Sequence, residues 1–265
     1  SCGNIAVRRE YELKGKSMHR DELENHLNQL LDISRFHDYC PNGLQVEGRD
    51  HIHTVISGVT ASLNLLEAAK AAKADAILVH HGYFWRGEDT RITGLKSRRI
   101  ALLMKHDINL FAYHLPLDIH PVFGNNACLG KKLGFIEIGR FGDQDIAAHG
   151  KLPQAVTLST LSEKISRTLL RKPMLVGDPD KSIQKIAWCT GAAQSYFEAA
   201  IQQGIDAFIT GEISEQTVHI ARESGVAFIA AGHHATERYG VQALGDHIAQ
   251  QFNIQHQFID IENPV

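Results

Sequence analysis

The sequence lacks the features that mark disulfide-bonded, membrane-spanning and nucleic-acid-binding proteins. Its four cysteines are far apart and form no C-x-x-C pair, which predicts a reduced cytosolic protein without a disulfide framework or a thiolate zinc site. No apolar run approaches the roughly 20 residues that a membrane-spanning helix needs. The net charge of -3 gives no electrostatic footprint for nucleic acid. A phosphate-binding loop of the G-x-x-x-x-G-K-[ST] type is also absent.

What the chain does contain is an ordinary globular composition with an excess of histidine. Its 265 residues, 43% of them hydrophobic and 22% charged, suffice for one large domain or two of ordinary size. The 16 histidines favour metal binding or acid/base chemistry, because histidine is the commonest transition-metal ligand and a common acid or base. Segment 1–17 has no signal-peptide core and Met18 resembles a natural start, so we interpret 1–17 as an extraneous leader.

From Met18 onward, apolar residues alternate between helical and strand-like spacing. Such alternation predicts an α/β fold in which a parallel sheet is covered by helices. The predicted strands are 54–59, 76–81, 108–113, 185–189, 207–210, 226–231 and 255–261. The predicted helices are 23–31, 62–73, 97–106, 155–170, 195–203, 215–223 and 236–251.

The second alternating block repeats the first at a shift of 131 residues without a gap. Asp75 coincides with Asp206, and the alanine-rich helices before them align. Chance similarity between two alanine-rich helices is the alternative, but a strand–helix–strand match at one register favours an internal duplication. We therefore predict two similar α/β units, at residues 18–140 and 141–265.

Two adjacent histidines, His80 and His81, end the apolar strand in the stretch AILVHHGYFW. Ligands of open α/β sheets bind at the carboxyl ends of the strands, so the pair is a candidate metal site. The alternative is a pair of ordinary loop histidines in a histidine-rich chain. Because successive residues of a strand point to opposite faces, both can bind metal only if the strand has ended, which Gly82 permits.

The repeat continues into a histidine and a carboxylate after the next strand of each block. INLFAYHLPLD carries His114 and, four residues on, Asp118. VAFIAAGHHATE carries His233 and, four residues on, Glu237. If the two units face each other, one central metal site receives residues from both.

Imidazole and carboxylate ligands together suit zinc, manganese, iron and similar ions. Two adjacent histidines suit two ions side by side, and dinuclear hydrolytic sites hold their ions roughly 3.5–4 Å apart. Such sites need a bridging carboxylate or water, for which Glu237 is the candidate, and Asp118 would be a terminal ligand.

Other residues near the predicted site leave alternatives open. His114 is a ligand, a partner of a ligand, or an acid/base, and His234 serves similarly or simply packs. Glu212 occupies the repeat position of His81 and binds substrate or assists the metal water, unless it is only a first-turn helix carboxylate. We take His114 and Glu212 as the candidate catalytic residues.

Two short segments have ordinary structural interpretations as well. Tyr83, Phe84 and Trp85 could stack on a flat ring, but core or subunit contact is the commoner role of such residues. Asn42 and Gly43 follow a proline, and we interpret them as turn chemistry rather than as substrate contacts.

Together these motifs resemble the NIF-three-like family, whose members are commonly named GTP cyclohydrolase 1 type 2 homologs, and in particular its short bacterial YbgI type. The resemblance covers Met18–Val265. It is carried by DYCPNGLQVEG, HHGYFW, HLPLD followed by GNNA, ITGE, GHHATE and FIDIENP.

The resemblance implies two similar, interlocked α/β units around a centre of two divalent ions, with iron, manganese, zinc and magnesium all plausible. It also implies a homohexameric ring with the metals facing an inner cavity. Longer relatives carry an inserted domain that this chain is too short to hold. All five family ligands are present: His80 and His81 on the two ions, Asp118 on one, His233 on the other and Glu237 bridging them.

Three functional hypotheses follow from these motifs. The leading one is a cytoplasmic, dinuclear metal-dependent hydrolase that acts on a nucleotide-like or other small cyclic substrate, as the family name implies. The rival is a non-catalytic metal-binding ring protein that serves as a scaffold or in the DNA-damage and radiation resistance linked to the YbgI type. Direct binding of DNA by the ring is the third, and the net charge disfavours it.

Overall fold

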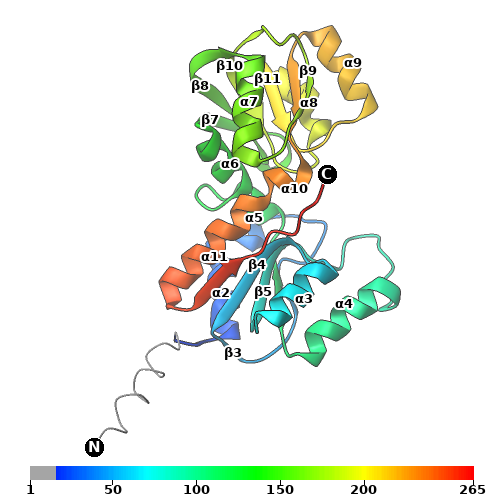
Figure 1. The fold of residues 1–265 in the computed structure, drawn as a ribbon, viewed down its shortest axis with the longest axis vertical. Helices are drawn as coiled ribbons and strands as arrows, with labels where there is room; N and C mark the ends of the chain where they lie inside the picture. The colour runs from blue at the N-terminus through cyan, green and yellow to red at the C-terminus, as the bar shows by residue number, and fades with distance from the viewer. Residues whose placement is uncertain (1–15) are drawn as a thin grey trace, which may run out of the picture. The chain divides into compact units, whose positions relative to one another are not determined.

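Two mixed β-sheets with flanking helices organise residues 16–265, the part of the chain that this computed structural model describes (Figure 1). The predicted leader, 1–17, lies almost wholly outside the described residues. The chain forms two compact units. Unit 1 comprises the described residues up to His114 together with Val241–Ile261, and unit 2 comprises Leu115–Gly240 with Glu262–Val265. The predicted α/β fold is confirmed.

The two units differ from the predicted division into 18–140 and 141–265. β13 (Gln255–Phe258) pairs in parallel with β4 (Thr54–Thr60), so the C-terminal segment completes the first sheet. α6 (Asn125–Leu133) instead buries its leucines in the core of unit 2. Both differences follow from the burial of apolar residues. Hydrophobic spacing along the chain predicts which residues are buried, but not which sheet they pack against.

Unit 1 is built around a five-stranded sheet with the order β13-β4-β5-β6-β2. Its strands are parallel except for β2, which runs antiparallel to β6. Leu65 of α3 and Leu103 of α4 pack fully buried against this sheet. The other elements of unit 1 are β1 (Met18–His19), α2 (Arg20–Leu30), β2 (Gly43–Val46), β3 (His51–Ile52), α3 (Leu63–Ala71), β5 (Ala76–His81), α4 (Gly94–Lys105), β6 (Asn109–Ala112) and, from Val241 onward, α11 (Arg238–Phe252).

Unit 2 is built around a six-stranded sheet with the order β7-β8-β10-β11-β12-β9. Trp188 and Ile209 belong to one buried apolar cluster of this unit, and Phe208 and Phe228 to another. The elements are α5 (Leu115–Ile119), β7 (Ile136–Phe141), β8 (Ala147–Thr157), α7 (Leu158–Leu169), β9 (Met174–Val176), β10 (Ser182–Trp188), α8 (Phe197–Ile201), β11 (Ala207–Thr210), α9 (Glu215–Ser224), β12 (Ala227–Ala230) and α10 (His233–Thr236).

Antiparallel strands in both sheets correct the prediction of a parallel sheet. β9 pairs antiparallel with β12, and β8 pairs antiparallel with both β7 and β10. β8 also takes the first residues of the predicted helix 155–170, which begins only at Leu158. The Thr157 hydroxyl accepts a hydrogen bond from the Thr160 N–H at 3.1 Å and so caps α7 at that point.

Both units share one arrangement of their parallel strands. In unit 1, β4, β5 and β6 are adjacent and parallel, and in unit 2, β10, β11 and β12 are adjacent and parallel. In each sheet an antiparallel strand lies beside the third of these strands: β2 pairs with β6, and β9 pairs with β12. The internal duplication stays a prediction, and this shared topology favours it.

The aspartates that the repeat aligns make equivalent contacts. Asp75 Oδ2 accepts hydrogen bonds from the N–H groups of His53 and Thr54, at 2.8 and 3.0 Å. Asp206 Oδ2 accepts from those of Gln184 and Lys185, at 2.9 and 2.8 Å. Each carboxylate therefore accepts hydrogen bonds from two successive backbone N–H groups, at the beginning of β4 in one unit and within β10 in the other.

We expect Asp206→Ala to lower the free energy of unfolding by about 2 kcal/mol, because two backbone donors lose a charged acceptor. Asp206→Asn is the matched control. Both donors of Gln184 and Lys185 use the same oxygen, and the asparagine retains one oxygen for them. Urea unfolding of the three proteins measures the difference. Equal stabilities of wild type and Asp206→Ala would contradict the assigned role.

The buried side chain of His256 in unit 1, hydrogen-bonded at both ring nitrogens, should make stability depend on pH. His256 Nδ1 lies 2.9 Å from Asp246 Oδ1, and its Nε2 lies 2.7 Å from Ser57 Oγ. Burial lowers the pKa of His256 from 6.5, and Asp246 only partly offsets this effect. The unfolded chain therefore takes up a proton at higher pH than the folded protein does.

We expect this histidine to stabilise the fold fully above about pH 6.5, its pKa in the unfolded chain, and progressively less as the pH falls through the lowered folded value. Replacing His256 with glutamine should remove this contribution, so the stability difference between variant and wild type should shrink on acidification. Urea titrations at several pH values measure it, and a difference that does not change with pH would refute the expectation.

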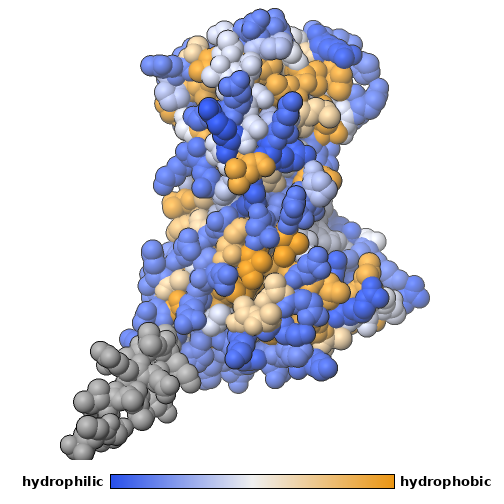
Figure 2. Space-filling view, viewed as in Figure 1, coloured by the Kyte–Doolittle hydropathy of each residue, from blue (hydrophilic) through white to orange (hydrophobic). Residues whose placement is uncertain are grey.

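The face of the molecule in Figure 2 is largely hydrophilic, with small hydrophobic areas between the polar residues. Scattered apolar exposure of this kind is normal for globular proteins. Within residues 16–265, no helix combines the length and apolarity needed to cross a membrane.

Candidate metal centre

His80 and His81 are the last two residues of β5, and their rings lie close together. The ring centroids are 4.6 Å apart with planes tilted by 43°. The strand includes both histidines and ends at His81, so it does not end before the pair as expected, but the two rings still lie close enough to serve one site. His80 is fully buried, and its Nδ1 lies 2.9 Å from the Tyr113 carbonyl. His81 Nδ1 lies 3.0 Å from Thr60 Oγ1.

His114 joins this pair within unit 1. One ring nitrogen from each of His80, His81 and His114 lies within 4.8 Å of those of the other two, which makes the three a candidate metal-binding group. Trp85 meets His114 edge to face, with ring centroids 4.9 Å apart. Trp85 therefore contacts a candidate site histidine. Tyr83, by contrast, is a buried core residue.

Two residues of the loop before β2 hold His114 in place. Asp38 Oδ1 lies 2.7 Å from His114 Nδ1, and the Asn42 side-chain oxygen accepts from the His114 N–H at 2.7 Å. Sequence reasoning missed both. It interpreted Asn42 as turn chemistry, whereas its side chain binds a candidate site residue. The only sequence signal was that both belong to DYCPNGLQVEG, one of the segments that carry the resemblance.

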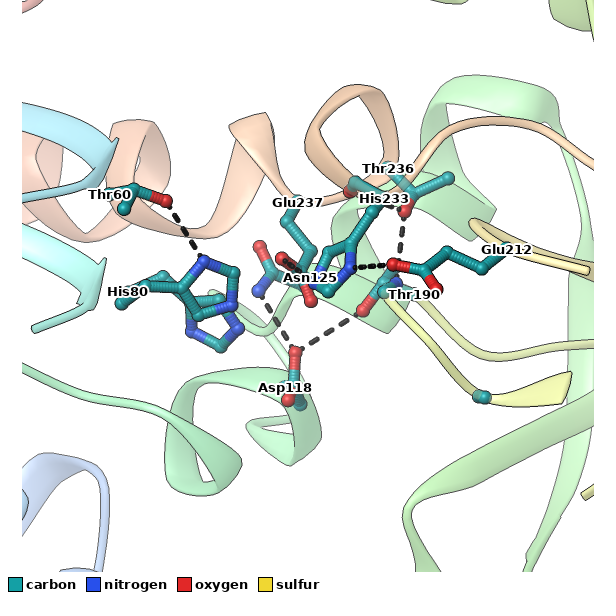
Figure 3. A network of polar contacts seen from close by, with 12 residues as sticks. Thr60, His80, Asp118, Asn125, Thr190, Glu212, His233, Thr236 and Glu237 are labelled. Atoms are coloured by element: carbon teal, nitrogen blue, oxygen red, sulfur yellow. Dashed lines mark hydrogen bonds and ion pairs between the residues drawn. The ribbon is translucent and has the colours of Figure 1, made fainter. Parts of the chain in front are cut away.

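Asp118 is the candidate ligand on α5 of unit 2, and two polar side chains orient it (Figure 3). Its Oδ1 accepts hydrogen bonds from Asn125 Nδ2 at 3.0 Å and from Thr190 Oγ1 at 3.2 Å. Asn125 Oδ1 in turn accepts from the Gly240 N–H at 2.9 Å. Asp118 is 5% exposed, so its carboxylate depends on these donors. Asn125 and Thr190 were not predicted from the sequence as part of the site.

His233 lies between two carboxylates in unit 2. Its Nδ1 is 2.7 Å from Glu212 Oε1, a contact drawn in Figure 3, and its Nε2 is 3.1 Å from Glu237 Oε2. Burial lowers the pKa of His233, but hydrogen bonds and charges from Glu237 and Glu212 outweigh burial and raise it to about 9. His233 begins the short helix α10, and Glu237 follows its last residue, so the i, i+4 spacing brings them together as predicted.

The backbone at Gly191 comes close to these two side chains. Gly191 has φ of +77°, and a Cβ there would lie 2.3 Å from Glu237 Oε1 and 3.3 Å from His233 Nε2. Its N–H donates to Thr236 Oγ1 at 3.0 Å. Glycine leaves room for the carboxylate of Glu237 at this position, a space that any side chain would fill.

The chemistry of these donors fits a divalent metal ion. Histidines that bind metal usually donate the other ring N–H to a carboxylate, a carbonyl or water. Nδ1 of His80, His114 and His233 each faces such an acceptor, and that of His81 faces a hydroxyl. Cys40 also lies near Asp38 and His114, but burial and Asp38 raise the pKa of its thiol to about 12. The imidazoles are therefore the better ligand set in unit 1.

These features define an α/β protein with a candidate cluster of metal-binding side chains. Residues 18–264 match the family described as Duf34/NIF3 (NGG1p interacting factor 3). The chain belongs to this family, and the resemblance predicted from its motifs is confirmed.

Similar proteins cover nearly the whole chain. A Pseudomonas aeruginosa protein named GTP cyclohydrolase 1 type 2 homolog is 52% identical over 91% of this chain and 97% of its own length. One of the same name from Yersinia pestis is 51% identical over 93% of this chain and 100% of its own length. The solved structure of protein ybgI, described as of unknown function, is 47% identical, covers 94% of this chain and 100% of its own, and gives a TM-score of 0.91.

Proposed function

We propose that this protein is a hydrolase that uses two divalent metal ions on a nucleotide-like or other small cyclic substrate. The observation that carries the proposal is the group of three imidazoles, His80, His81 and His114, in unit 1. The name of the relatives, GTP cyclohydrolase 1 type 2 homolog, supports GTP as the first substrate to test. Bound metal ions would supply Lewis-acid activation of water.

The proposed ligands are those that the sequence motifs imply. We propose His80 and His81 on the two ions, Asp118 on one, His233 on the other and Glu237 as the bridge. What supports the assignment is that each histidine has a partner at Nδ1 and that Asn125 and Thr190 orient Asp118.

Glu212 has a role in this proposal through His233. Its carboxylate faces Nδ1, so it fixes the ring orientation and increases the basicity of the opposite nitrogen. Proton transfer by Glu212 or His114 during turnover stays a prediction. The cytoplasmic location and the homohexameric ring, which light scattering would test, also stay predictions.

Turnover of GTP tests the proposed function. We expect metal-loaded wild type to hydrolyse GTP or another cyclic compound of a broad panel, and His81→Ala and Glu237→Ala to reduce turnover at least about 100-fold. Circular dichroism checks that both variants fold, and chromatography identifies the product. Normal turnover in either folded variant would contradict the proposal. Stable metal without hydrolysis of any compound would instead support the non-catalytic scaffold.

A further inference from the structure

We propose that the loop Asp38–Gly43 makes His114 a further imidazole ligand beside His80 and His81. The five ligands that the family resemblance implies do not include His114. The inference rests on the proposed function only in requiring that a divalent metal binds at this cluster. It assigns Asp38 and Asn42 as positioning residues, which act through His114.

The hydrogen bond at Nδ1 determines which ring nitrogen of His114 can bind a metal. A carboxylate is an acceptor only, so the 2.7 Å contact with Asp38 Oδ1 places the ring proton on Nδ1 and the lone pair on Nε2. The Tyr113 carbonyl does the same for His80 at 2.9 Å. His114 therefore has the same tautomer as a predicted ligand and a carboxylate partner of the kind found behind metal-bound histidines.

The loop fixes the Asp38 carboxylate before it meets the imidazole. Asp38 Oδ1 accepts from the Tyr39 N–H at 2.6 Å, and Oδ2 accepts from Asn42 Nδ2 at 2.9 Å. The Asp38 side chain is only 4% exposed. Asn42 also accepts from the His114 N–H at 2.7 Å. One loop thus holds both the backbone and the ring of His114, which limits the ring to one orientation.

The spacing of the three rings brings His114 within reach of an ion held by either neighbouring histidine. Nitrogen ligands at about 2.0–2.1 Å from a zinc ion lie about 3–4 Å from one another. One ring nitrogen from each of His80, His81 and His114 lies within 4.8 Å of those of the other two, so shifts of about 1 Å complete the geometry. Three histidines are a known zinc ligand set. When the donors of unit 2 are removed, the three imidazoles of unit 1 are therefore enough for one ion.

Zinc binding by the full chain lacking the donors of unit 2 tests the inference. In the background Asp118→Ala/His233→Ala/Glu237→Ala, we expect about one zinc ion per chain, measured by competition with a chromophoric chelator. Adding His114→Gln should weaken zinc binding about 100-fold, and adding Asp38→Ala about 10–100-fold. His51→Gln, which removes an exposed imidazole of the same unit, is the matched control and should change nothing.

X-ray absorption of zinc-loaded protein gives a second readout in the otherwise unmodified chain. We expect His114→Gln to lose one imidazole from the average zinc coordination, whereas His51→Gln loses none. An unchanged zinc affinity and imidazole count in His114→Gln would overturn the inference, while hydrolysis by the same wild-type preparation would leave the proposed function standing. Absence of zinc from wild type at millimolar concentration would overturn both.

Discussion

Replacing Gly191 with alanine is expected to weaken metal binding by about 100-fold, although it adds one methyl group. That methyl would lie 2.3 Å from Glu237 Oε1 and 3.3 Å from His233 Nε2. A glutamate side chain can swing away at little cost to stability, but the atom displaced is a proposed metal ligand. The expected result is therefore a folded protein with a damaged site, which zinc competition and elemental mass spectrometry would detect.

Gly204→Ala is the matched control for this substitution. Gly204 has φ of +69°, close to the +77° of Gly191, but nothing lies within 4 Å of its added Cβ. Both variants carry the backbone cost of a left-handed alanine, about 1–2 kcal/mol. Only Gly191→Ala should also lose metal. Equal metal affinities of the two variants would show that the close approach at Gly191 does not serve the site.

Removing the Glu237 carboxylate is expected to have the largest effect on metal content. We expect wild type, purified without added metal or a histidine tag, to carry about two ions per chain, and Glu237→Ala to carry one or none. The reason is that the proposed bridging ligand is lost, while the remaining donors of unit 2, His233 and Asp118, bind an ion less tightly. Elemental mass spectrometry measures the content and names the metal.

Unit 2 offers a matched control for that variant. Glu215 and His219 also form an i, i+4 pair, with Oε1 3.0 Å from Nε2, but both side chains are well exposed. Glu215→Ala removes a carboxylate of the same kind and should leave the metal content unchanged. Metal content that is the same in wild type and Glu237→Ala would refute the bridging role and favour the scaffold hypothesis.

The parallel strands of the fold could be predicted from the sequence because strands buried on both faces consist of short, continuous runs of apolar residues. β11 coincides with the predicted strand 207–210, and β5 with the predicted 76–81. The antiparallel strands could not be predicted in the same way. β8 alternates exposed and buried residues and contains glycine and proline, so its spacing resembles a mixed segment and its last residues resemble a helix.

Site residues could be predicted from the sequence where the residue type itself indicates metal binding. They could not be predicted where the role depends only on the position of the residue in the fold. Histidines at strand ends stand out, so His80, His81 and His233 could be named from the sequence. Asp38 and Asn42 could not, because a carboxylate just before a Pro-Asn-Gly turn and an amide within it resemble ordinary turn residues. Their partner, His114, lies 76 and 72 residues away along the chain, and only the fold brings them together.

The pairing of β13 with β4 affects how the chain folds during synthesis. Thr54 meets Gln255 in adjacent strands 201 residues apart, so the first sheet cannot acquire its β13 edge until Gln255–Phe258 has emerged. Almost all of unit 2 lies between them as one continuous stretch, Leu115–Gly240. During synthesis the second unit can therefore fold first, while one edge of β4 is still unpaired. During that interval the unpaired N–H and C=O groups along β4 are open to mispairing with another strand.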